Sequence, residues 1–220
     1  RMDQSALARK RAQLLSDGVL MMDPEAVYVE EGVTVGAGTL LLPGTILRGK
    51  TAVGTGCEIG PNTMLTDCTV GDGAVVNSSQ CSESTIGAGA HVGPFAYIRP
   101  GCHVGRDVKV GDFVELKNSA IGDGTKISHL TYIGDADVGA RCNFGCGTVV
   151  VNYDGRKKYR TTVGDGCFIG CNTNLVSPVT VGDGAYTAAG STITDDVPPR
   201  TLAIARARQV NKAVWKDKRD

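Results

Sequence analysis

The residues best suited to chemistry lie in two stretches, 128–135 and 143–155, where a regular repeat is interrupted by side chains that the repeat does not need. The first stretch holds an imidazole, His129, and a phenol, Tyr132, three positions further on. An unperturbed imidazole titrates near ~6.5 and can take a proton from an amine at neutral pH. A single histidine is often an ordinary surface residue, so both interpretations stay open for His129.

Two cations stand where the repeat usually has a glycine or another small residue. Arg99 and Lys117 are eighteen residues apart. If eighteen residues make one coil of a solenoid, the two side chains lie one above the other on the same face. An arginine can hold an oxyanion through two hydrogen bonds, so the pair is a candidate phosphate clamp.

The element that must position these residues is a repeat of six. Aliphatic residues recur at this spacing from Val27 to Ile193, glycine often follows them, and the register shortens by one in a few places. A period of six fits neither an amphipathic helix nor a simple alternation, but it fits short strands joined by glycine corners. The sequence therefore predicts an all-β parallel solenoid over residues 19–198, interrupted by an extruded loop at 152–162 that carries Tyr153 and Lys158.

The ends of the chain differ from the repeat. Residues 4–17 are strong helix formers, and Gly18 is placed to end a helix. Leu7, Leu14 and Leu15 give this helix a narrow apolar stripe, so we expect residues 1–18 to form a helical arm that packs on the solenoid. After Pro198 and Pro199, residues 199–220 are predicted to form an irregular tail. Its basic residues are either a solvated end or a binding segment.

The composition excludes several classes of protein. Lys plus Arg and Asp plus Glu number 23 each, which gives no reason to expect nucleic acid or a membrane surface as a partner. No apolar run approaches the ~20 residues of a membrane helix. The start of the chain lacks the pattern of a signal peptide, so the cytoplasm is the expected location. The first residue is Arg1 rather than Met, so we expect the chain to be a fragment or to begin with the remnant of a tag.

The eight cysteines are interpreted as packing residues rather than as disulfide or zinc ligands. Cys57, Cys102, Cys142 and Cys167 each follow a repeat-starting aliphatic residue by four positions, so they occupy one equivalent place. A free cysteine in such a place behaves as a small buried apolar residue. Cys142/Cys146 and Cys167/Cys171 have a C-x-x-x-C spacing, unlike the C-x-x-C of most zinc knuckles.

The repeat resembles that of the left-handed parallel β-helix acyltransferases, a resemblance that implies three hexapeptides per coil, left-handed crossovers and a homotrimer. A closer resemblance rests on the combination of Arg99-Pro100-Gly101, the segment 113–117, the segment 129–135, Asn143, and Asn152-Tyr153-Asp154-Gly155. Together these motifs resemble the C-terminal acetyltransferase domain of the bifunctional N-acetylglucosamine-1-phosphate uridylyltransferases/glucosamine-1-phosphate N-acetyltransferases. The uridylyltransferase half of that family is absent from this chain.

The resemblance implies a reaction and a set of roles. His129 would be the general base that deprotonates the 2-amino group of glucosamine 1-phosphate, which then attacks acetyl-CoA directly. The product, N-acetylglucosamine 1-phosphate, is used to make UDP-N-acetylglucosamine, a cell-wall precursor. The resemblance implies no metal in the acetyl transfer and active sites at the interfaces between subunits. The residues implied to bind the sugar phosphate are Arg99, Lys117, Tyr132, Asn143 and Lys158, and those implied on the acetyl-CoA side are Cys146, Asn152, Tyr153, Cys171, Ala189 and Arg206.

The chain departs from the family at two of these positions. Cys146 stands where alanine is expected, and the backbone N–H there would polarise the thioester carbonyl whatever the side chain. Cys171 replaces an expected serine, and a thiol is a weaker hydrogen-bond donor than a hydroxyl.

Three other functions remain open at this stage. One is a different hexapeptide acyltransferase, with another amino sugar or serine as the acceptor. The second is a non-catalytic β-helix scaffold. The third is a zinc hydratase using His91, His103 and His129, although the first two are twelve residues apart and are expected on different faces of the coil.

Overall fold

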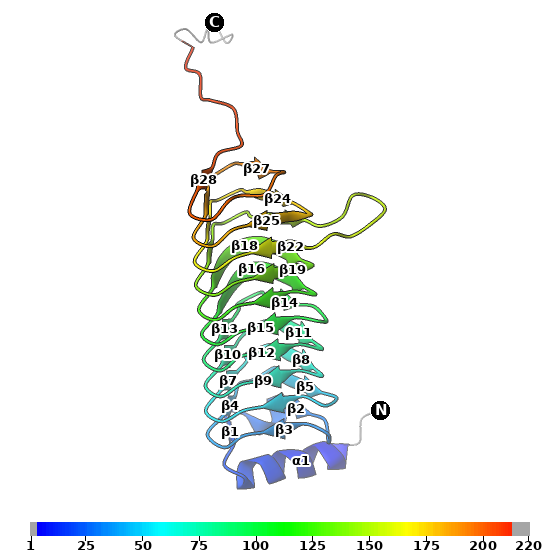
Figure 1. Cartoon of the computed structure of the whole chain (residues 1–220). Coiled ribbons are helices and arrows are strands. Elements are labelled where there is room, and N and C mark those ends of the chain that lie inside the picture. The colour runs from blue at the N-terminus through cyan, green and yellow to red at the C-terminus, as the bar shows by residue number, and fades with distance from the viewer. Residues whose placement is uncertain (1–3, 213–220) are drawn as a thin grey trace, which may run out of the picture.

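The computed structural model describes residues 4–212, which form one helix and a tall three-sided prism of stacked β-coils (Figure 1). Every ladder between strands is parallel, and each strand pairs with the strand on the same face one coil away. The fold is therefore the parallel β-solenoid that the repeat predicted, and it is consistent with a left-handed coil. Coils contact only their neighbours, so the two ends need covering.

The first face of the prism, called face 1, begins next to the helix. Its strands are β1 (Leu20–Met21), β4 (Leu40–Leu41), β7 (Glu58–Ile59), β10 (Val75–Val76), β13 (His91–Val92), the first halves of β16 (Lys109–Lys117) and β18 (Lys126–Gly134), β20 (Asn143–Phe144), β23 (Phe168–Ile169), β26 (Tyr186–Thr187) and β28 (Leu202–Ala203).

Face 2 follows face 1 in each coil. Its strands are β2 (Tyr28–Val29), β5 (Ile46–Arg48), β8 (Met64–Thr66), β11 (Gln80–Ser82), β14 (Tyr97–Ile98), the second halves of β16 and β18, β21 (Val149–Val151), β24 (Asn174–Val176) and β27 (Thr192–Ile193).

Face 3 is a separate sheet in which nine strands stack in chain order. Its strands are β3 (Thr34–Val35), β6 (Ala52–Val53), β9 (Thr69–Val70), β12 (Thr85–Ile86), β15 (His103–Val104), β17 (Ala120–Ile121), β19 (Ala136–Val138), β22 (Thr161–Val163) and β25 (Val179–Val181).

The core is a stack of the aliphatic residues that defined the repeat. Each short strand turns one of them toward the prism axis, so that Ile98 and Leu116 pair in register, as do Leu116 and Ile133, and all three are fully buried. Small residues fill the space behind the corners. Cys57, Cys102, Cys142 and Cys167 are all buried, which confirms their interpretation as packing residues.

Acidic residues close many of the corners between faces 3 and 1. Asp72 Oδ1 accepts a hydrogen bond from the Thr55 backbone N–H at 2.7 Å, and Asp123 Oδ1 accepts one from Arg106 N–H at the same distance. Each carboxylate therefore ties its corner to the coil before it. The glycine that follows Asp72 has a φ of +67°, a conformation that favours glycine.

Strands β16 and β18 are longer than the others because each continues around the corner between faces 1 and 2. The two strands form one parallel ladder that runs from Lys109↔Lys126 to Lys117↔Gly134. The pair Asp112↔His129 lies at the bend. The backbone turns there through positive φ values at Phe113 and Leu130. This bent ribbon joins faces 1 and 2 into one sheet and places side chains of both faces on the same two strands.

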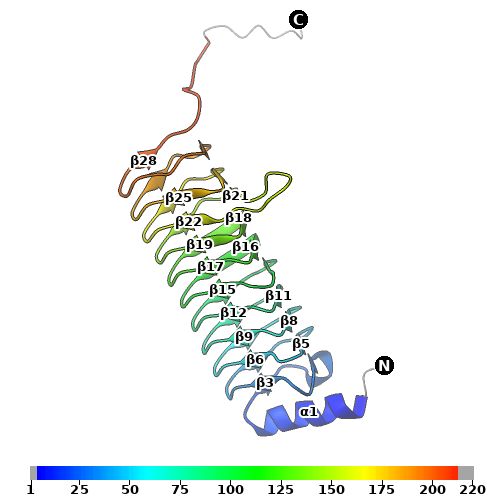
Figure 2. The same cartoon turned by 45° about the vertical axis from the view of Figure 1, so that its right-hand side comes forward.

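Helix α1 (Gln4–Ser16) covers the first coil, as Figures 1 and 2 show, with a short 3₁₀ turn, η1 (Pro24–Ala26), close by. Leu7 and Leu14 are buried as predicted, and the Arg11 guanidinium pairs with Glu25 at 3.0 Å. The prediction for Leu15 was wrong, because it lies on the exposed side of the helix and Arg11 takes the buried place on the inner side.

The other end of the solenoid extends further than predicted. β28 pairs with β26 (Tyr186↔Leu202), so the coil continues past the expected boundary at residue 198 before the tail leaves it. The extruded loop is shorter than expected, because Thr161 and Thr162 belong to β22. The part of the tail from residue 213 onward lies outside the described residues. Within residues 4–212 no helix is long and apolar enough to span a membrane.

Candidate active site

The imidazole of His129 is held by a carboxylate from the neighbouring coil. His129 Nδ1 lies 2.7 Å from Asp112 Oδ1, and both side chains are partly exposed at the corner between faces 1 and 2. The hydrogen bond from His129 lowers the pKa of Asp112, so this carboxyl is ionised at neutral pH. An ionised Asp112 can only accept a hydrogen bond, so in the neutral imidazole the proton is on Nδ1 and Nε2 carries the free lone pair.

The corner that carries His129 also carries three of the six residues implied to contact acetyl-CoA. Val110, Ile127, Phe144, Ile169 and Thr187 pair in register from coil to coil on face 1. The residue two positions after each of these occupies the same place at the corner. We call this set the corner column, and its members are Asp112, His129, Cys146, Cys171 and Ala189.

Arg206 lies at the far end of the corner column. It follows β28, whose Ala203 pairs with Thr187, and its Cδ lies beside Gly190, the residue after Ala189. Adjacent coils are about 4.8 Å apart, so the four coil steps from His129 to the level of Arg206 span about 19 Å. An imidazole and a guanidinium thus stand four coil steps apart along one column, with the exposed small residues Cys146, Cys171 and Ala189 between them.

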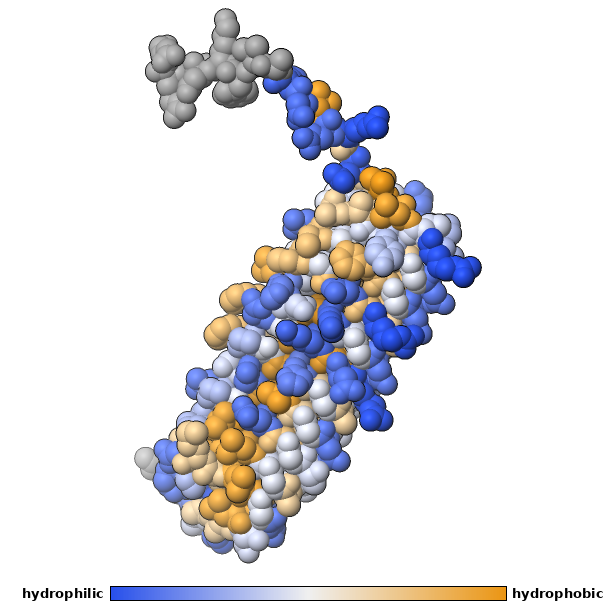
Figure 3. Space-filling model, turned by 90° about the vertical axis from the view of Figure 1, so that its left-hand side faces the viewer, coloured by the Kyte–Doolittle hydropathy of each residue, from blue (hydrophilic) through white to orange (hydrophobic). Residues whose placement is uncertain are grey.

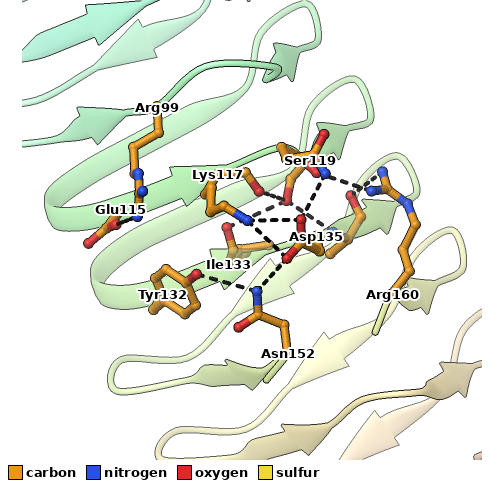
Figure 4. A network of polar contacts seen from close by, with 11 residues as sticks. Arg99, Glu115, Lys117, Ser119, Tyr132, Ile133, Asp135, Asn152 and Arg160 are labelled. Carbon is orange, nitrogen blue, oxygen red and sulfur yellow. Dashed lines mark hydrogen bonds and ion pairs between the residues drawn. The ribbon is translucent and has the colours of Figure 1, made fainter. Parts of the chain in front are cut away.

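Face 2 carries a cluster of cations at its other edge, where face 2 meets face 3 (Figure 4). Arg99 follows Ile98 and Lys117 follows Leu116, and because these two aliphatic residues pair, the cations stand on neighbouring coils, as their spacing predicted. Arg99 Nη1 pairs with Glu115 Oε1 at 2.9 Å. Lys158 reaches this cluster from the loop, and its hydrogen bond with Lys117 and the repulsion between the two charges lower the pKa of Lys158. Two ammonium groups in contact form a site that an anion would stabilise.

Asp135 is the centre of this network, as Figure 4 shows, although sequence reasoning gave it no role. The residue is only 7% exposed. Its carboxylate accepts hydrogen bonds from Lys117 Nζ at 3.1 Å, Asn118 Nδ2 at 2.7 Å and Asn152 Nδ2 at 2.6 Å. Burial acts to raise the pKa of Asp135, but these three donors outweigh burial and lower it.

The same contact affects the partner of Asp135. Burial acts to lower the pKa of Lys117, but the Asp135 carboxylate outweighs burial and raises it. Both groups are therefore charged at neutral pH, and the ion pair fixes the direction of the Lys117 ammonium.

Gly134 makes room for the phenol and the amide of this network. Gly134 pairs in register with Lys117 of the preceding coil. A Cβ at residue 134 would collide with the Tyr132 hydroxyl and the Asn152 amide. Asn152 Nδ2 donates to the Tyr132 hydroxyl at 3.5 Å. Glycine at 134 therefore allows Tyr132 and Asn152 to lie over Asp135.

The loop that supplies Lys158 is anchored at its base by Arg160. The guanidinium makes a two-pronged ion pair with Asp137, with both N···O distances at 2.6 Å, and donates to the Asn118 carbonyl oxygen at 3.1 Å. Tyr153 also forms a bridge with Lys158 across the loop, and its hydroxyl donates to the Gly155 carbonyl oxygen. The loop is thus tied to the prism on face 3 and holds Lys158 over face 2.

The structure divides the residues implied for the sugar phosphate. Arg99, Lys117, Tyr132 and Lys158 gather on or over face 2, whereas Asn143 begins β20 on face 1. Outward side chains on two faces of a convex prism diverge, so one chain does not close all five around one small molecule.

The residues implied for acetyl-CoA are divided as well. Asn152 lies in the Asp135 network and Tyr153 in the loop, away from the corner column that holds Cys146 and Cys171. Asp112 and Asp135 are the two functional candidates that sequence reasoning missed. The only sequence signal for Asp112 was its seventeen-residue distance from His129, one less than a full coil.

The other histidines do not join His129. His91 lies in β13 on face 1 and His103 in β15 on face 3, which confirms the expectation that they fall on different faces. Among residues 4–212 no group of three or more His, Cys, Asp and Glu side chains is arranged to hold a metal ion.

A parallel β-solenoid built from six-residue repeats, with a histidine at one corner, belongs to the hexapeptide class of β-helix proteins. The family model described as "Bacterial transferase hexapeptide (six repeats)" matches residues 83–118 and 160–195. The chain is 53% identical over 203 residues to the bifunctional protein GlmU of Clostridium botulinum and 55% identical over 205 residues to that of Clostridium acetobutylicum. These matches confirm the resemblance drawn from the motifs, and the chain belongs to the hexapeptide-repeat acyltransferase family.

The matches cover most of this chain but only part of its relatives. They include 92% and 93% of the chain, which spans 44% and 45% of the two GlmU proteins. Among solved structures, the UDP-N-acetylglucosamine acyltransferase of Arabidopsis aligns with a TM-score of 0.50 at 18% identity, over 85% of this chain and 69% of that one. This structural likeness supports the fold.

Proposed function

We propose that the chain is a glucosamine-1-phosphate N-acetyltransferase that uses acetyl-CoA as the acetyl donor. The observation that carries the proposal is the arrangement along face 2, which has the carboxylate-held imidazole at one edge, the cluster of cations at the other, and the corner column running on from the imidazole. The similarity to the bifunctional GlmU proteins supports the same assignment. The reaction needs a base for an amine, a holder for a phosphate and a groove for a coenzyme, and the two edges of face 2 have a candidate for each.

His129 is the proposed general base. With Asp112 on Nδ1, the free Nε2 takes a proton from the 2-amino group of the sugar as the nitrogen attacks the thioester carbon. CoA thiol leaves, and no covalent intermediate with the protein is required. The backbone N–H of Cys146, which has no acceptor within residues 4–212, supports a role in holding the oxyanion of the tetrahedral intermediate.

Arg99, Lys117 and Lys158 are proposed to hold the phosphate. The ion pairs of Arg99 with Glu115 and of Lys117 with Asp135 orient the two coil-borne cations before substrate binds. Preorganised donors lose less freedom on binding than free side chains do. Tyr132, which pairs in register with Glu115, is proposed to contact the sugar beside them.

The corner column is proposed as the groove for acetyl-CoA. Cys146, Cys171 and Ala189 present a row of small side chains that starts one coil from His129, and Arg206 supplies a positive charge for a coenzyme phosphate at the other end. Roughly 19 Å between the base and this cation leaves room for an extended coenzyme arm between them.

A homotrimer with sites between subunits is part of the proposal. Asn143 lies on face 1 and does not meet Lys117 of face 2 within one chain, and a second copy packed beside this chain would supply the missing contact. The corner between faces 1 and 2 exposes Phe95, Phe113 and Leu130, each by 58–60%, and the rings of Phe95 and Phe113 stack. The view of the prism in Figure 3 likewise shows hydrophobic side chains among hydrophilic ones along its surface. Such a row of exposed apolar groups fits burial against another copy.

The direct test is thiol release from acetyl-CoA in the presence of glucosamine 1-phosphate, with glucosamine 6-phosphate and serine as control acceptors. Release only with the 1-phosphate is the expected result. Release with one of the controls would keep the acyltransferase family but overturn the acceptor. A folded oligomer that releases no thiol with any acceptor would favour a scaffold.

A further inference from the structure

Two of the eight cysteines differ from the rest in their surroundings. Six are buried, and only Cys146 and Cys171 are exposed. Among the buried ones, Cys142 Sγ lies 3.0 Å from the Gly164 carbonyl oxygen, and burial raises the pKa of the Cys142 thiol to about 11. The sulfurs of Cys146 and Cys171 have no hydrogen-bond partner within residues 4–212, so both thiols are open to reagents in solution.

The two exposed cysteines are adjacent in the corner column, although twenty-five residues separate them in the sequence. Phe144 and Ile169 pair in register, and each cysteine stands two positions after one of these residues. The backbones remain hydrogen-bonded through the corner, because Gly145 N–H donates to the Ile169 carbonyl oxygen at 2.7 Å and Asn172 N–H donates to the Cys146 carbonyl oxygen at 2.8 Å.

This separation is one that a disulfide can bridge. Neighbouring strands lie about 4.7–4.9 Å apart, and disulfides join Cα atoms that are about 4.4–6.8 Å apart. Gly145 permits the close approach, because a Cβ there would collide with the backbone nitrogen of Cys171. The C-x-x-x-C pairs seen in the sequence are not the reactive ones, since Cys142 and Cys167 point into the core.

We propose that Cys146 and Cys171 form a dithiol site that low-molecular-weight disulfides convert to an intramolecular disulfide. The thiolate of one cysteine attacks the reagent disulfide, forms a mixed disulfide and displaces one thiolate of the reagent. The second cysteine then attacks the protein sulfur of the mixed disulfide, closes the Cys146–Cys171 bond and displaces the other reagent thiolate. Two protein thiols are oxidised, one reagent disulfide is reduced to two thiols, and the two protons pass to the released thiolates.

The expected preference for a reagent rests on the proposed function. If the corner column binds acetyl-CoA, coenzyme A disulfide docks on it through the same contacts and reaches the two sulfurs faster than glutathione disulfide does. Closing the bond also draws the two side chains together in the middle of the column, so the oxidised protein loses its affinity for acetyl-CoA. The dithiol site itself requires only the geometry of the two coils.

The test treats the fully reduced, folded protein with glutathione disulfide and, separately, with coenzyme A disulfide, followed by alkylation and peptide mapping. The expected result is a cross-linked peptide pair joining Cys146 to Cys171, while the other six cysteines are alkylated after unfolding. Cys146→Ser and Cys171→Ser should each give a stable mixed disulfide on the remaining cysteine. Stable mixed disulfides on both cysteines of the wild-type chain, or cross-links that involve other cysteines, would overturn the proposal.

Two readouts separate this inference from the proposed function. A cross-link that forms equally fast with both reagents, and that leaves acetyl transfer unchanged, would keep the dithiol site and count against the corner column as the coenzyme groove. Faster reaction with coenzyme A disulfide, protection by acetyl-CoA, and recovery of the transfer rate after reduction would support both. Each serine variant is compared with its own untreated rate, so that a change in coenzyme binding is not mistaken for oxidation.

Discussion

The imidazole of His129 and the carboxylate of Asp112 face each other at 2.7 Å from two adjacent coils of the prism. The two residues lie in different hexapeptides, and the pair exists only because β16 and β18 stay in register around a corner. The carboxylate orients the ring and selects the tautomer that exposes Nε2. The ring is therefore already oriented before any substrate binds.

Replacing this carboxylate should affect turnover more than substrate binding. We expect Asp112→Asn to lower kcat by about 10- to 100-fold, because the amide no longer requires a proton on Nδ1, and His129→Ala to lower kcat by about 10²–10⁴-fold. The KM for acetyl-CoA should change little in either variant. Asp123→Asn, at a corner away from the site, is the control. Wild-type kcat in Asp112→Asn would show that the pair has no positioning role.

The phosphate clamp has a matched control within the same sheet. Arg48 comes directly after Leu47 on face 2 as Arg99 comes after Ile98, and each arginine makes an ion pair with a glutamate of a neighbouring coil. We expect Arg99→Gln to raise the KM for glucosamine 1-phosphate by about 10- to 100-fold, the usual effect of losing a charged hydrogen bond. Arg48→Gln should leave this KM unchanged. Equal effects of the two substitutions would locate the phosphate elsewhere.

Binding of the sugar phosphate should weaken at high pH. Contact with Lys117 lowers the pKa of Lys158 below the usual value of ~10.4, so Lys158 is the first of the two to lose its charge as the pH rises. We expect the KM for glucosamine 1-phosphate to increase over this range in the wild type and to depend less on pH in Lys158→Gln. The measurement is the KM for glucosamine 1-phosphate at several alkaline pH values in the wild type and in Lys158→Gln, with Lys157→Gln as the control. A wild-type pH dependence retained in Lys158→Gln would contradict it.

Asp135 should stabilise the fold in a pH-dependent way. The pKa of Asp135 is lower in the folded chain than in the unfolded chain. As the pH falls, the unfolded chain therefore takes up a proton at this group first. The stability that Asp135 supplies is complete above the unfolded pKa of ~3.9 and is lost as the pH falls toward the folded value.

At neutral pH we expect Asp135→Asn to lower the free energy of unfolding by about 3 kcal/mol, because it leaves the Lys117 ammonium without its buried partner. The difference from the wild type should shrink below pH ~4. Denaturant unfolding at several pH values, with the exposed Asp195→Asn as the control, tests both statements. A difference that stays constant down to low pH would exclude the ion pair as its source.

The sequence by itself determined the architecture, because a six-residue repeat needs only local information. The repeat supplies one buried aliphatic residue per hexapeptide, as with Ile98, Leu116 and Ile133. A chain that buries such a series forms a coil, and its outward side chains then lie in rows. For that reason the spacing of Arg99 and Lys117 was enough to place them on neighbouring coils, and the position of Cys142 and Cys167 was enough to bury them.

Only the tertiary structure decided which residues of different coils meet. The number of residues per coil varies. Asp112 and His129 are adjacent although seventeen residues apart in the sequence, and Cys146 and Cys171 are on adjacent coils although twenty-five residues apart, because the extruded loop lies between them. Asp135 and Asn152 became partners because a glycine leaves space above the ion pair and because Arg160 fixes the base of the loop. Contacts of this kind depend on three-dimensional register and side-chain direction, which a periodic sequence does not encode at any single position.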